Sequence, residues 1–485
     1  MSLTRRSPAI EPAAPLSKDL QSPPSFADHP SIRNFQLPTT KPMTNLRLLA
    51  PFVAISAMMA MPVQAQSLIT LYDSALGFDS AFQSAKAQLD ANQYRAEQAR
   101  AGLLPRVALA AGASTSFLSL GPDIGPKTDR GYSAFSAAVN ASHPLYGPVN
   151  QVNFDLAKKT LDQALAQLAL VEQDLVVRVS QAYFDVLASQ DSLTFVQAQK
   201  AAVAEQLASA KRNFEVGTST ITDTREAQAR FDLVRAQEIA AENDLRVKKL
   251  TLDQVVGKLE TRPQPVALPL ALPPVIPADV NLWVQQSQEM HPSVRLAQIG
   301  LDVALLETAK ARAAEKPTVD LVGNYGTLRN QDGSASSPVG AWSNSATIGV
   351  NFNLPIYTGN AVQNRIRETL ALEEKSRSDL EGARRGVAQA TRATYYGLLS
   401  GQGQVQALEA AEISSQSALD ANKLGYQVGV RINIDVLNAQ SQLFQTKRDL
   451  AKARYDVLVG ALRLRQANGT LKAEDLQRID ALLVK

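Results

Sequence analysis

Few side chains in this sequence are able to do chemistry, and they lie far apart. The three histidines, His29, His143 and His291, lack the spacing of a metal site, and the chain has no cysteine. The sequence contains no glycine-rich phosphate loop, no Gly-x-Ser-x-Gly turn and no His-Glu-x-x-His pair. We therefore expect no catalytic residue, no metal and no cofactor, and we expect that the protein is not an enzyme.

A short break between two predicted helices, at residues 215–220, is followed by an acidic side chain, Asp223. Gly217 in this break is most simply a turn residue with a positive φ angle. Asp223 stands three residues before Glu226, which is the spacing of a capping box at the start of a helix. Capping alone would explain Asp223, although a cap at a helical tip can also take part in opening that tip.

A second break, at residues 427–431, carries the matching glycine, Gly429. Arg431 and Asp435 share this tip, and Arg431 could also be an ordinary solvated charge. Capping explains Asp435 less completely, because Asn438 occupies the position that corresponds to Glu226.

These two breaks occupy equivalent positions in two internal repeats of the sequence. Pro105 returns as Pro317 and Gly257 returns as Gly469, and the difference is 212 residues in both cases. One constant offset indicates two structural repeats with nearly equal loops, and self-similarity of this kind outranks local propensity.

Each repeat contains a pair of predicted strands that lies between helices. The four strands are expected at residues 106–120, 132–143, 318–328 and 342–354. The last strand alternates most strictly, which is typical of a sheet with one apolar and one polar face. Its apolar side is formed by Trp342, Ala346, Ile348, Val350, Phe352 and Leu354. Its other side is formed by Ser343, Ser345, Thr347, Gly349, Asn351 and Asn353.

Long helices follow each strand pair. We expect them at residues 149–214 and 361–426, with return helices at 222–257 and 434–468. Each long helix would measure roughly 100 Å, which favours coiled-coil or tubular packing. In the last helix, Val436, Leu443, Leu450, Val457 and Leu464 recur every seven residues. A parallel row is formed by Leu437, Phe444, Ala451 and Leu458, so this helix is expected to pack against more than one neighbour.

The N-terminal region carries the pattern of a secretory signal inside the chain. A positive stretch at 43–47, an apolar stretch at 48–61 and Val63-Gln64-Ala65 predict a signal peptide at 43–65. Residues 1–42 are then either a start codon assigned too early or a disordered leader. The domain plan continues with a first repeat at 66–257, a proline-rich linker at 258–278, a second repeat at 279–469 and a tail at 470–485.

The composition limits the partners. Charged residues make up 20% of the chain and the net charge is +3, which argues against nucleic acid. Four strands of bilayer-spanning length cannot close a membrane barrel, because the smallest use about eight. Several copies would therefore have to share one barrel, with the apolar strand face toward lipid. The alternative is a soluble sheet that caps a helical bundle.

In these features the sequence resembles the TolC family of bacterial outer-membrane efflux proteins, over nearly the whole chain from Leu68. The motifs that carry the resemblance are Phe214-Glu215-Val216-Gly217 with Asp223, Tyr426-Gln427-Val428-Gly429 with Asp435, Asn353-Leu354-Pro355-Ile356-Tyr357-Thr358-Gly359 and Asn468-Gly469-Thr470-Leu471. The resemblance implies a mainly α fold with a membrane β-barrel part. It implies a homotrimer with a 12-stranded barrel, a periplasmic tunnel of helices and a belt formed by the linker and the tail.

The resemblance also implies a gate at the periplasmic end. Tyr426 and Arg431 match residues that tether the inner coiled coil to partners near Thr222 and Asp223. Asp435 matches one of two acidic residues in a ring at the constriction. Asn438 takes the second acidic position, so this ring would carry half the charge and bind cations less tightly.

The function that follows is a passive exit duct in the outer membrane. The implied partners are a periplasmic adaptor protein that docks at the tips with Gly217 and Gly429, an inner-membrane ABC or proton-driven transporter, and outer-membrane lipid. The cargo would be secreted proteins, small toxic compounds or both. The competing hypothesis is a periplasmic adaptor or structural coiled-coil protein without a pore.

Overall fold

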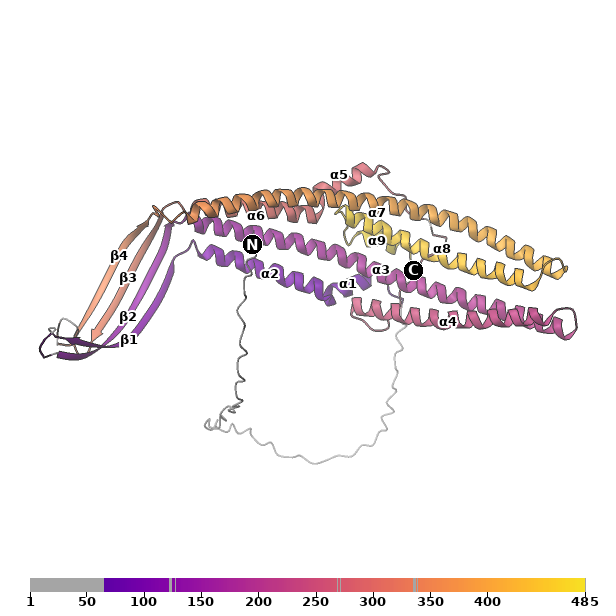
Figure 1. Ribbon diagram of the computed structural model, residues 1–485, viewed down its shortest axis with the longest axis horizontal. Helices are drawn as coiled ribbons and strands as arrows, with labels where there is room; N and C mark the ends of the chain where they lie inside the picture. The colour runs from indigo at the N-terminus through magenta and orange to yellow at the C-terminus, as the bar shows by residue number, and fades with distance from the viewer. Residues whose placement is uncertain are drawn as a thin grey trace, which may run out of the picture. The chain divides into compact units, whose positions relative to one another are not determined.

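The computed structural model describes residues 65–121, 124–126, 128–267, 269–270, 272–334, 337 and 339–484. The leader at 1–42 lies outside the described residues, and so does the predicted signal peptide apart from Ala65. Within the described part, each half of the chain places two antiparallel strands between helices, in the order α1–α2–β1–β2–α3–α4 and then α5–α6–β3–β4–α7–α8, with α9 in the tail (Figure 1). This is the mainly α fold with four strands that the sequence predicts.

The helical stretch that precedes each strand pair is broken once, at equivalent positions. In the first half, α1 (Leu68–Phe78) and α2 (Ser80–Ala101) meet at Asp79, whose carboxylate accepts a hydrogen bond from the Phe82 amide at 2.8 Å. In the second half, α5 (Val280–Met290) and α6 (Pro292–Ala313) meet at His291, whose Nδ1 accepts from the Ser293 amide at 3.0 Å. Pro292 marks the second break in the sequence, whereas no proline marks the one at Asp79.

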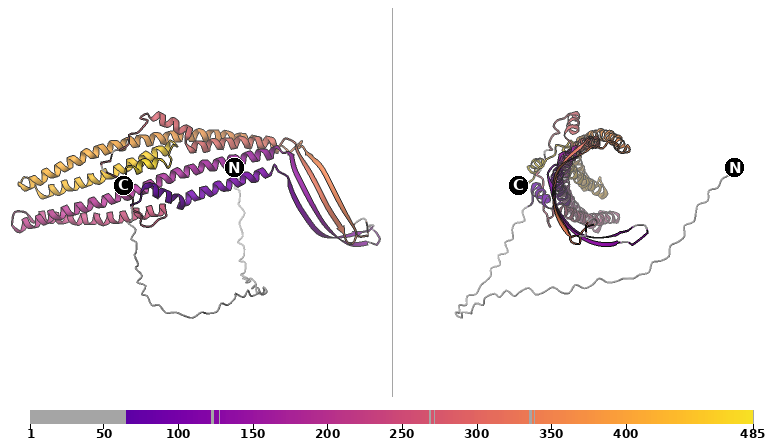
Figure 2. Two further views of the ribbon diagram at one scale, coloured as in Figure 1. Left: turned by 180° about the vertical axis from the view of Figure 1, so that it is seen from behind. Right: turned by 90° about the vertical axis from the view of Figure 1, so that its left-hand side faces the viewer.

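The four strands form one antiparallel sheet in the order β1-β2-β3-β4. Their bounds are Arg106–Leu120, Thr128–Tyr146, Thr318–Asn330 and Ala341–Asn353. The two repeats join where β2 pairs with β3, so β1 and β4 are the outer strands of this sheet. The right-hand view of Figure 2 shows that the sheet is curved.

The pairing register aligns most of the large apolar side chains of the four strands on one face. Val350 lies opposite Leu321, and Leu109 lies opposite Val139, so each pair shares a face of the sheet. The apolar face contains Val107, Leu109, Phe117, Phe135, Val139, Leu321, Tyr325, Trp342, Ile348, Val350 and Phe352, and all of them are exposed in the single chain. The other face carries mainly small and polar residues, with Leu118, Tyr132, Val322 and Leu328 among them. The alternation is therefore strictest in β4 and weaker in the other strands.

Three strands differ from their predicted bounds. β2 was predicted at 132–143 and extends to both sides, because pairing with β1 continues through its polar start and pairing with β3 continues through its end. β3 continues two residues beyond 328, and β4 ends at Asn353, so Leu354 lies outside it. Backbone pairing decides these ends, and alternation of side chains does not report it.

Two antiparallel helix pairs extend away from the sheet. They are α3 (Pro148–Glu215) with α4 (Ile221–Val256), and α7 (Ala361–Gln427) with α8 (Asn433–Ala467), within one residue of the predicted bounds. At 1.5 Å per residue, α3 is about 100 Å long. Among the described helices, none is both long and apolar enough to cross a bilayer.

The two seven-residue rows of α8 pack against two different neighbours. Val436 and Leu443 lie in an apolar cluster with Leu419 of α7. Leu437 of the second row packs instead with Val203 and other residues of α3 and α4. The predicted seams are confirmed, and α8 is the helix that connects the two pairs.

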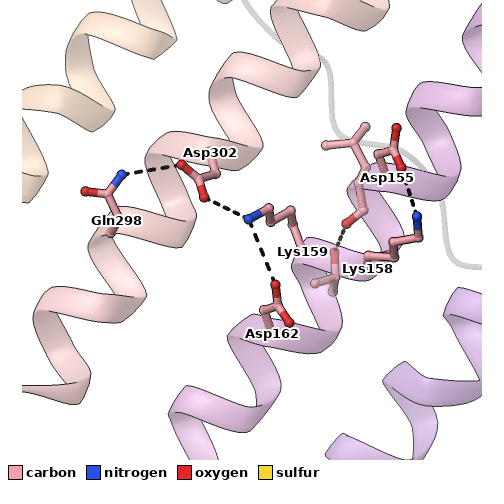
Figure 3. A network of polar contacts seen from close by, with 8 residues as sticks. Asp155, Lys158, Lys159, Asp162, Gln298 and Asp302 are labelled. Carbon is pink, nitrogen blue, oxygen red and sulfur yellow. Dashed lines mark hydrogen bonds and ion pairs between the residues drawn. The ribbon is translucent and has the colours of Figure 1, made fainter. Parts of the chain in front are cut away.

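Nearer the sheet, α3 is held by α2 and α6 rather than by α4 and α8. Figure 3 shows Lys159 of α3 between Asp302 of α6, at 2.9 Å, and Asp162 of its own helix, at 4.0 Å. Asp302 holds the pKa of Lys159 above its usual value. Such half-exposed pairs add little stability, but they fix which helices are neighbours at this level.

The linker and the tail meet beside the middle of α3. The Gln66 amide donates to the Arg262 carbonyl at 2.7 Å, and the Ala267 amide donates to the Leu482 carbonyl at 2.9 Å. Val266 and Leu483 form a single bridge, because prolines in the linker remove the donors that a ladder needs. The tail contains one short helix, α9 (Asp475–Asp480). Linker and tail therefore meet mainly as irregular chain.

We expect Gly469→Ala to destabilise the protein strongly. Gly469 has φ +78°, and a Cβ there would come within 2.5 Å of the His291 Cα atom, which cannot move aside as a side chain can. We expect a loss of about 2–3 kcal/mol, measured as a fall in the temperature at which the purified protein unfolds. Gly429→Ala is the matched control, since Gly429 has φ +81° and open space around it. Equal effects of the two substitutions would show that backbone strain alone matters.

Candidate functional site at the helical tips

The tip between α3 and α4 is closed by a local network around Asp223. Thr220 is the N-cap of α4, its hydroxyl accepts from the Asp223 amide at 3.2 Å, and the Asp223 carboxylate accepts from the Thr220 amide at 3.1 Å. The Ser219 hydroxyl donates to the same carboxylate at 2.6 Å and is the main reason why the pKa of Asp223 lies below its usual value. The capping box is therefore Thr220–Asp223. The predicted Asp223–Glu226 box was wrong, because the helix begins earlier than the sequence suggested.

The tip between α7 and α8 lacks this network although its backbone is similar. Gly217 and Gly429 have φ angles of +79° and +81°, which confirms both as positive-φ turn residues. Ile432 occupies the N-cap position and offers no side-chain acceptor. Asp435 is consequently not a cap partner, and its one ion pair among the described residues is with Arg431 at 3.7 Å.

Four polar contacts connect the second tip to the first helix pair. The Asn213 amide group donates to the Tyr426 hydroxyl at 3.2 Å. Asn433 accepts from Gln206 at 2.5 Å and donates to the Asp223 carbonyl at 3.4 Å. Arg230 donates to the Asn438 side chain at 2.7 Å. These contacts tie α7 and α8 to α3 and α4 within one chain.

The structure brings the predicted gate residues to one end of the molecule and changes their partners. Tyr426 contacts Asn213 instead of Thr222 or Asp223, because the hydroxyl points toward α3. Arg431 pairs with Asp435 of its own tip, and Thr222 is exposed with no side-chain hydrogen bond to a described residue. The predicted tethers to Thr222 and Asp223 are therefore not formed within a single chain.

Sequence reasoning missed the central residue of this site, Asn433. Its side chain is 1% exposed, and it bridges α3 and α4. One signal was available: Asn433 is polar at the first position of an apolar-patterned helix, where the first repeat has Ile221. A buried amide is costly unless it is hydrogen-bonded, so such a residue predicts a specific partner.

The polar contacts continue along the α3–α8 seam above the tips. Arg448 donates to the buried Gln199 at 3.0 Å, and the Tyr455 hydroxyl donates to Asp191 at 2.7 Å. Burial raises the pKa of Asp191 despite this hydrogen bond, and burial lowers the pKa of Arg448. Farther toward the sheet Phe184 stacks on Tyr455, within a large apolar cluster. The seam thus combines polar contacts with apolar packing along its length.

No group of three or more His, Cys, Asp or Glu residues within the described part of the chain is arranged to hold a metal ion. The chemistry available at the tips is the making and breaking of hydrogen bonds and ion pairs between helices. Such contacts can be exchanged when helices move, so the tips are a candidate site of conformational change.

Comparison with known families decides the relationship. The model of the outer membrane efflux protein family matches residues 71–258 and again residues 283–470, so both repeats match it, displaced by the same 212 residues. The chain belongs to the outer membrane efflux protein family. It is therefore an export duct of the outer membrane that extends into the periplasm.

Relatives agree over almost the full length. The chain is 34% identical to outer membrane protein TolC of Vibrio cholerae, over 90% of this chain and 98% of that protein. It is 31% identical to alkaline protease secretion protein AprF of Pseudomonas aeruginosa, over 87% and 88% of the two chains. The crystal structure of VceC from Vibrio cholerae superposes with a TM-score of 0.70 at 19% identity, covering 83% of this chain and 96% of that one, which shows the shared fold.

Proposed function

We propose that three copies of this chain form one channel, with twelve strands in a single barrel. The curved four-stranded sheet supports this, because it has two outer strands whose edges no described segment covers. Unpaired edges cannot face lipid, and four strands are fewer than the roughly eight of the smallest membrane barrels. Pairing β4 of one copy with β1 of the next removes every edge.

In this assembly the apolar face of the sheet contacts lipid. Trp342, Ile348, Val350 and Phe352 are 72%, 85%, 63% and 65% exposed in the single chain, which is unusual for four large apolar side chains on one strand. The opposite face, with Asn324 and Thr347, lines water. The continuous apolar face is the observation that carries the proposal.

The helices of three copies continue the barrel as a tunnel, and the tips of α7 and α8 form its gate. Three Asp435 side chains would then surround the axis at the constriction. Asn438 is neutral and already binds Arg230, so this ring carries one acidic residue per copy and holds cations weakly.

The partners follow from the exposed tips. Val216, Val428 and Val430 flank Gly217 and Gly429 and are exposed, so both turns offer apolar contacts to a periplasmic adaptor protein. Energy comes from an inner-membrane ABC or proton-driven transporter that the adaptor joins to the duct. The likeness to AprF, whose name states protease secretion, supports secreted protein as cargo.

We expect the purified protein to run as a trimer that heat converts to monomer in detergent, and to conduct ions across a planar lipid film. Both results follow from a barrel that closes between copies. The measurement combines gel mobility before and after heating with single-channel recording. A water-soluble monomer that leaves the film insulating would refute the proposal.

A further inference from the structure

We propose that Arg329 binds the phosphate group of a phosphorylated glucosamine lipid in the outer leaflet. This inference rests on the proposed function, since it requires the apolar face of the sheet to contact lipid. The register places Arg329 on that face, directly between Phe135 of β2 and Trp342 of β4. A cation between two aromatic residues thus lies on a surface that is otherwise apolar at this level.

The position of Arg329 along the strands corresponds to one edge of the membrane. Trp342 and Phe352 are ten residues apart on β4, or about 33 Å along an extended strand. At the usual tilt of 35–45°, this spans about 25 Å, which is the height of the apolar band of outer-membrane barrels. Arg329 is near the end of β3 and Trp342 near the start of β4, so both border the loop that joins these strands. That end of the sheet is the one away from the helices (Figure 1). Because the helices are periplasmic, this end is the outer leaflet.

Arg329 has no side-chain partner among the residues that the structure describes. Its side chain is exposed and makes no hydrogen bond or ion pair with any described residue. It is the one Lys or Arg on the apolar face of the described strand residues, whereas Arg106 and Arg130 lie on the opposite face. Arg130 also differs in having a protein partner, since its guanidinium donates to the Ser337 carbonyl at 2.6 Å. Arg329 is therefore the cation that the apolar face offers to lipid.

The energetics favour a phosphate ligand at this place. A lipid-facing arginine costs about 2–4 kcal/mol at the bilayer centre and only about 0–1 kcal/mol near the interface. The planar guanidinium can donate two parallel hydrogen bonds to a phosphate, and such charge-assisted bonds are the strong ones. Phe135 and Trp342 on either side supply apolar contact for acyl chains at the headgroup level. A phosphate attached directly to a glucosamine headgroup at this interface would be within reach of the Arg329 guanidinium, and this is the ligand that we propose.

The test uses the complete trimer in a zwitterionic detergent. Lipid A with its phosphates, lipid A without phosphates, and phosphatidylglycerol are titrated separately, and tryptophan emission is recorded. The chain has two tryptophans, and Trp283 is 6% exposed in α5, so the lipid-dependent change reports Trp342. The variants are Arg329→Gln, Arg329→Lys and, as the matched control on the opposite face, Arg130→Gln.

We expect saturable binding of phosphorylated lipid A to the native protein. Arg329→Gln should weaken it at least about tenfold, Arg329→Lys should retain part of it, and Arg130→Gln should leave it unchanged. Equal affinity of the native protein and Arg329→Gln, or equal affinity for dephosphorylated lipid A, would overturn the inference. Equal binding of phosphatidylglycerol would also overturn the choice of ligand.

The same preparations separate this inference from the proposed function. Each variant is first examined for the heat-sensitive trimer and for conductance, neither of which depends on Arg329. A native preparation that is monomeric or does not conduct counts against the proposed function. A trimeric, conducting protein whose lipid affinity ignores Arg329 counts against the lipid site alone.

Discussion

Ile348→Arg is expected to abolish assembly of the trimer in the outer membrane. Ile348 is 85% exposed in the middle of the apolar face, where a lipid-facing arginine costs about 2–4 kcal/mol. Three copies in one barrel multiply this cost to roughly 6–12 kcal/mol, which is as large as the stability of a whole domain. The measurement is the amount of heat-sensitive trimer in outer-membrane fractions of cells that express each variant.

The neighbouring residue provides the control. Thr347 lies on the opposite face, level with Asn324, so Thr347→Arg should place its charge in the water-filled interior and leave assembly intact. It should instead change the ion selectivity of the channel. If Thr347→Arg blocked assembly while Ile348→Arg did not, the two faces of the sheet would be assigned the wrong way round.

The second large effect is expected at the helical tips. Tyr426→Phe together with Asn433→Ala removes the hydrogen bonds that join α7 and α8 to Asn213, Gln206 and the Asp223 carbonyl. We count one link of about 1 kcal/mol for each of the two substitutions. The equilibrium between the closed and the open tip then shifts roughly thirtyfold toward the open state. Single-channel conductance and open probability should both rise. Adding Arg431→Ser should contribute little more, because its half-exposed contact with Asp435 spans 3.7 Å.

The duplication provides the control for this experiment as well. Ile221 is the equivalent of Asn433 in the first repeat and is exposed, so Ile221→Ala should leave conductance unchanged. A folded, trimeric double variant with the conductance of the native protein would contradict a gate held by these contacts. The apolar cluster around Phe184 lies at the middle of the helices and is distant from the tips. The double substitution should therefore leave the stability of the trimer unchanged.

The features that repeat over many residues were predictable from the sequence. A constant offset gave the two halves, and alternation in the strand that starts near Trp342 gave the faces of the sheet. The seven-residue rows of α8 predicted that it packs against more than one neighbour, because burial is the physical cause of such periods. The linker and tail could be predicted to meet only through the family resemblance, since irregular chain carries no period.

The polar contacts at the helical tips could not be predicted from repeating patterns. Asp223 was assigned to the wrong capping box, because Thr220 and Glu226 both stand three residues away from it. Asn433 was overlooked, because one buried amide at the start of a helix leaves no periodic signal. Partners such as Gln206 and Arg230 are more than 200 residues away in sequence, and only the fold brings them together.

The different caps of the two tips have a consequence for symmetry. A ring of three duplicated chains contains six helix pairs that would be nearly interchangeable if the repeats had stayed alike. Ile432 stands where the first repeat has Thr220, so the pair of α7 and α8 lacks a capping box. Asn433 stands where the first repeat has Ile221 and hydrogen-bonds this pair to α3 and α4. In the proposed trimer the six helix pairs are therefore two different sets of three, and the symmetry of the ring is threefold.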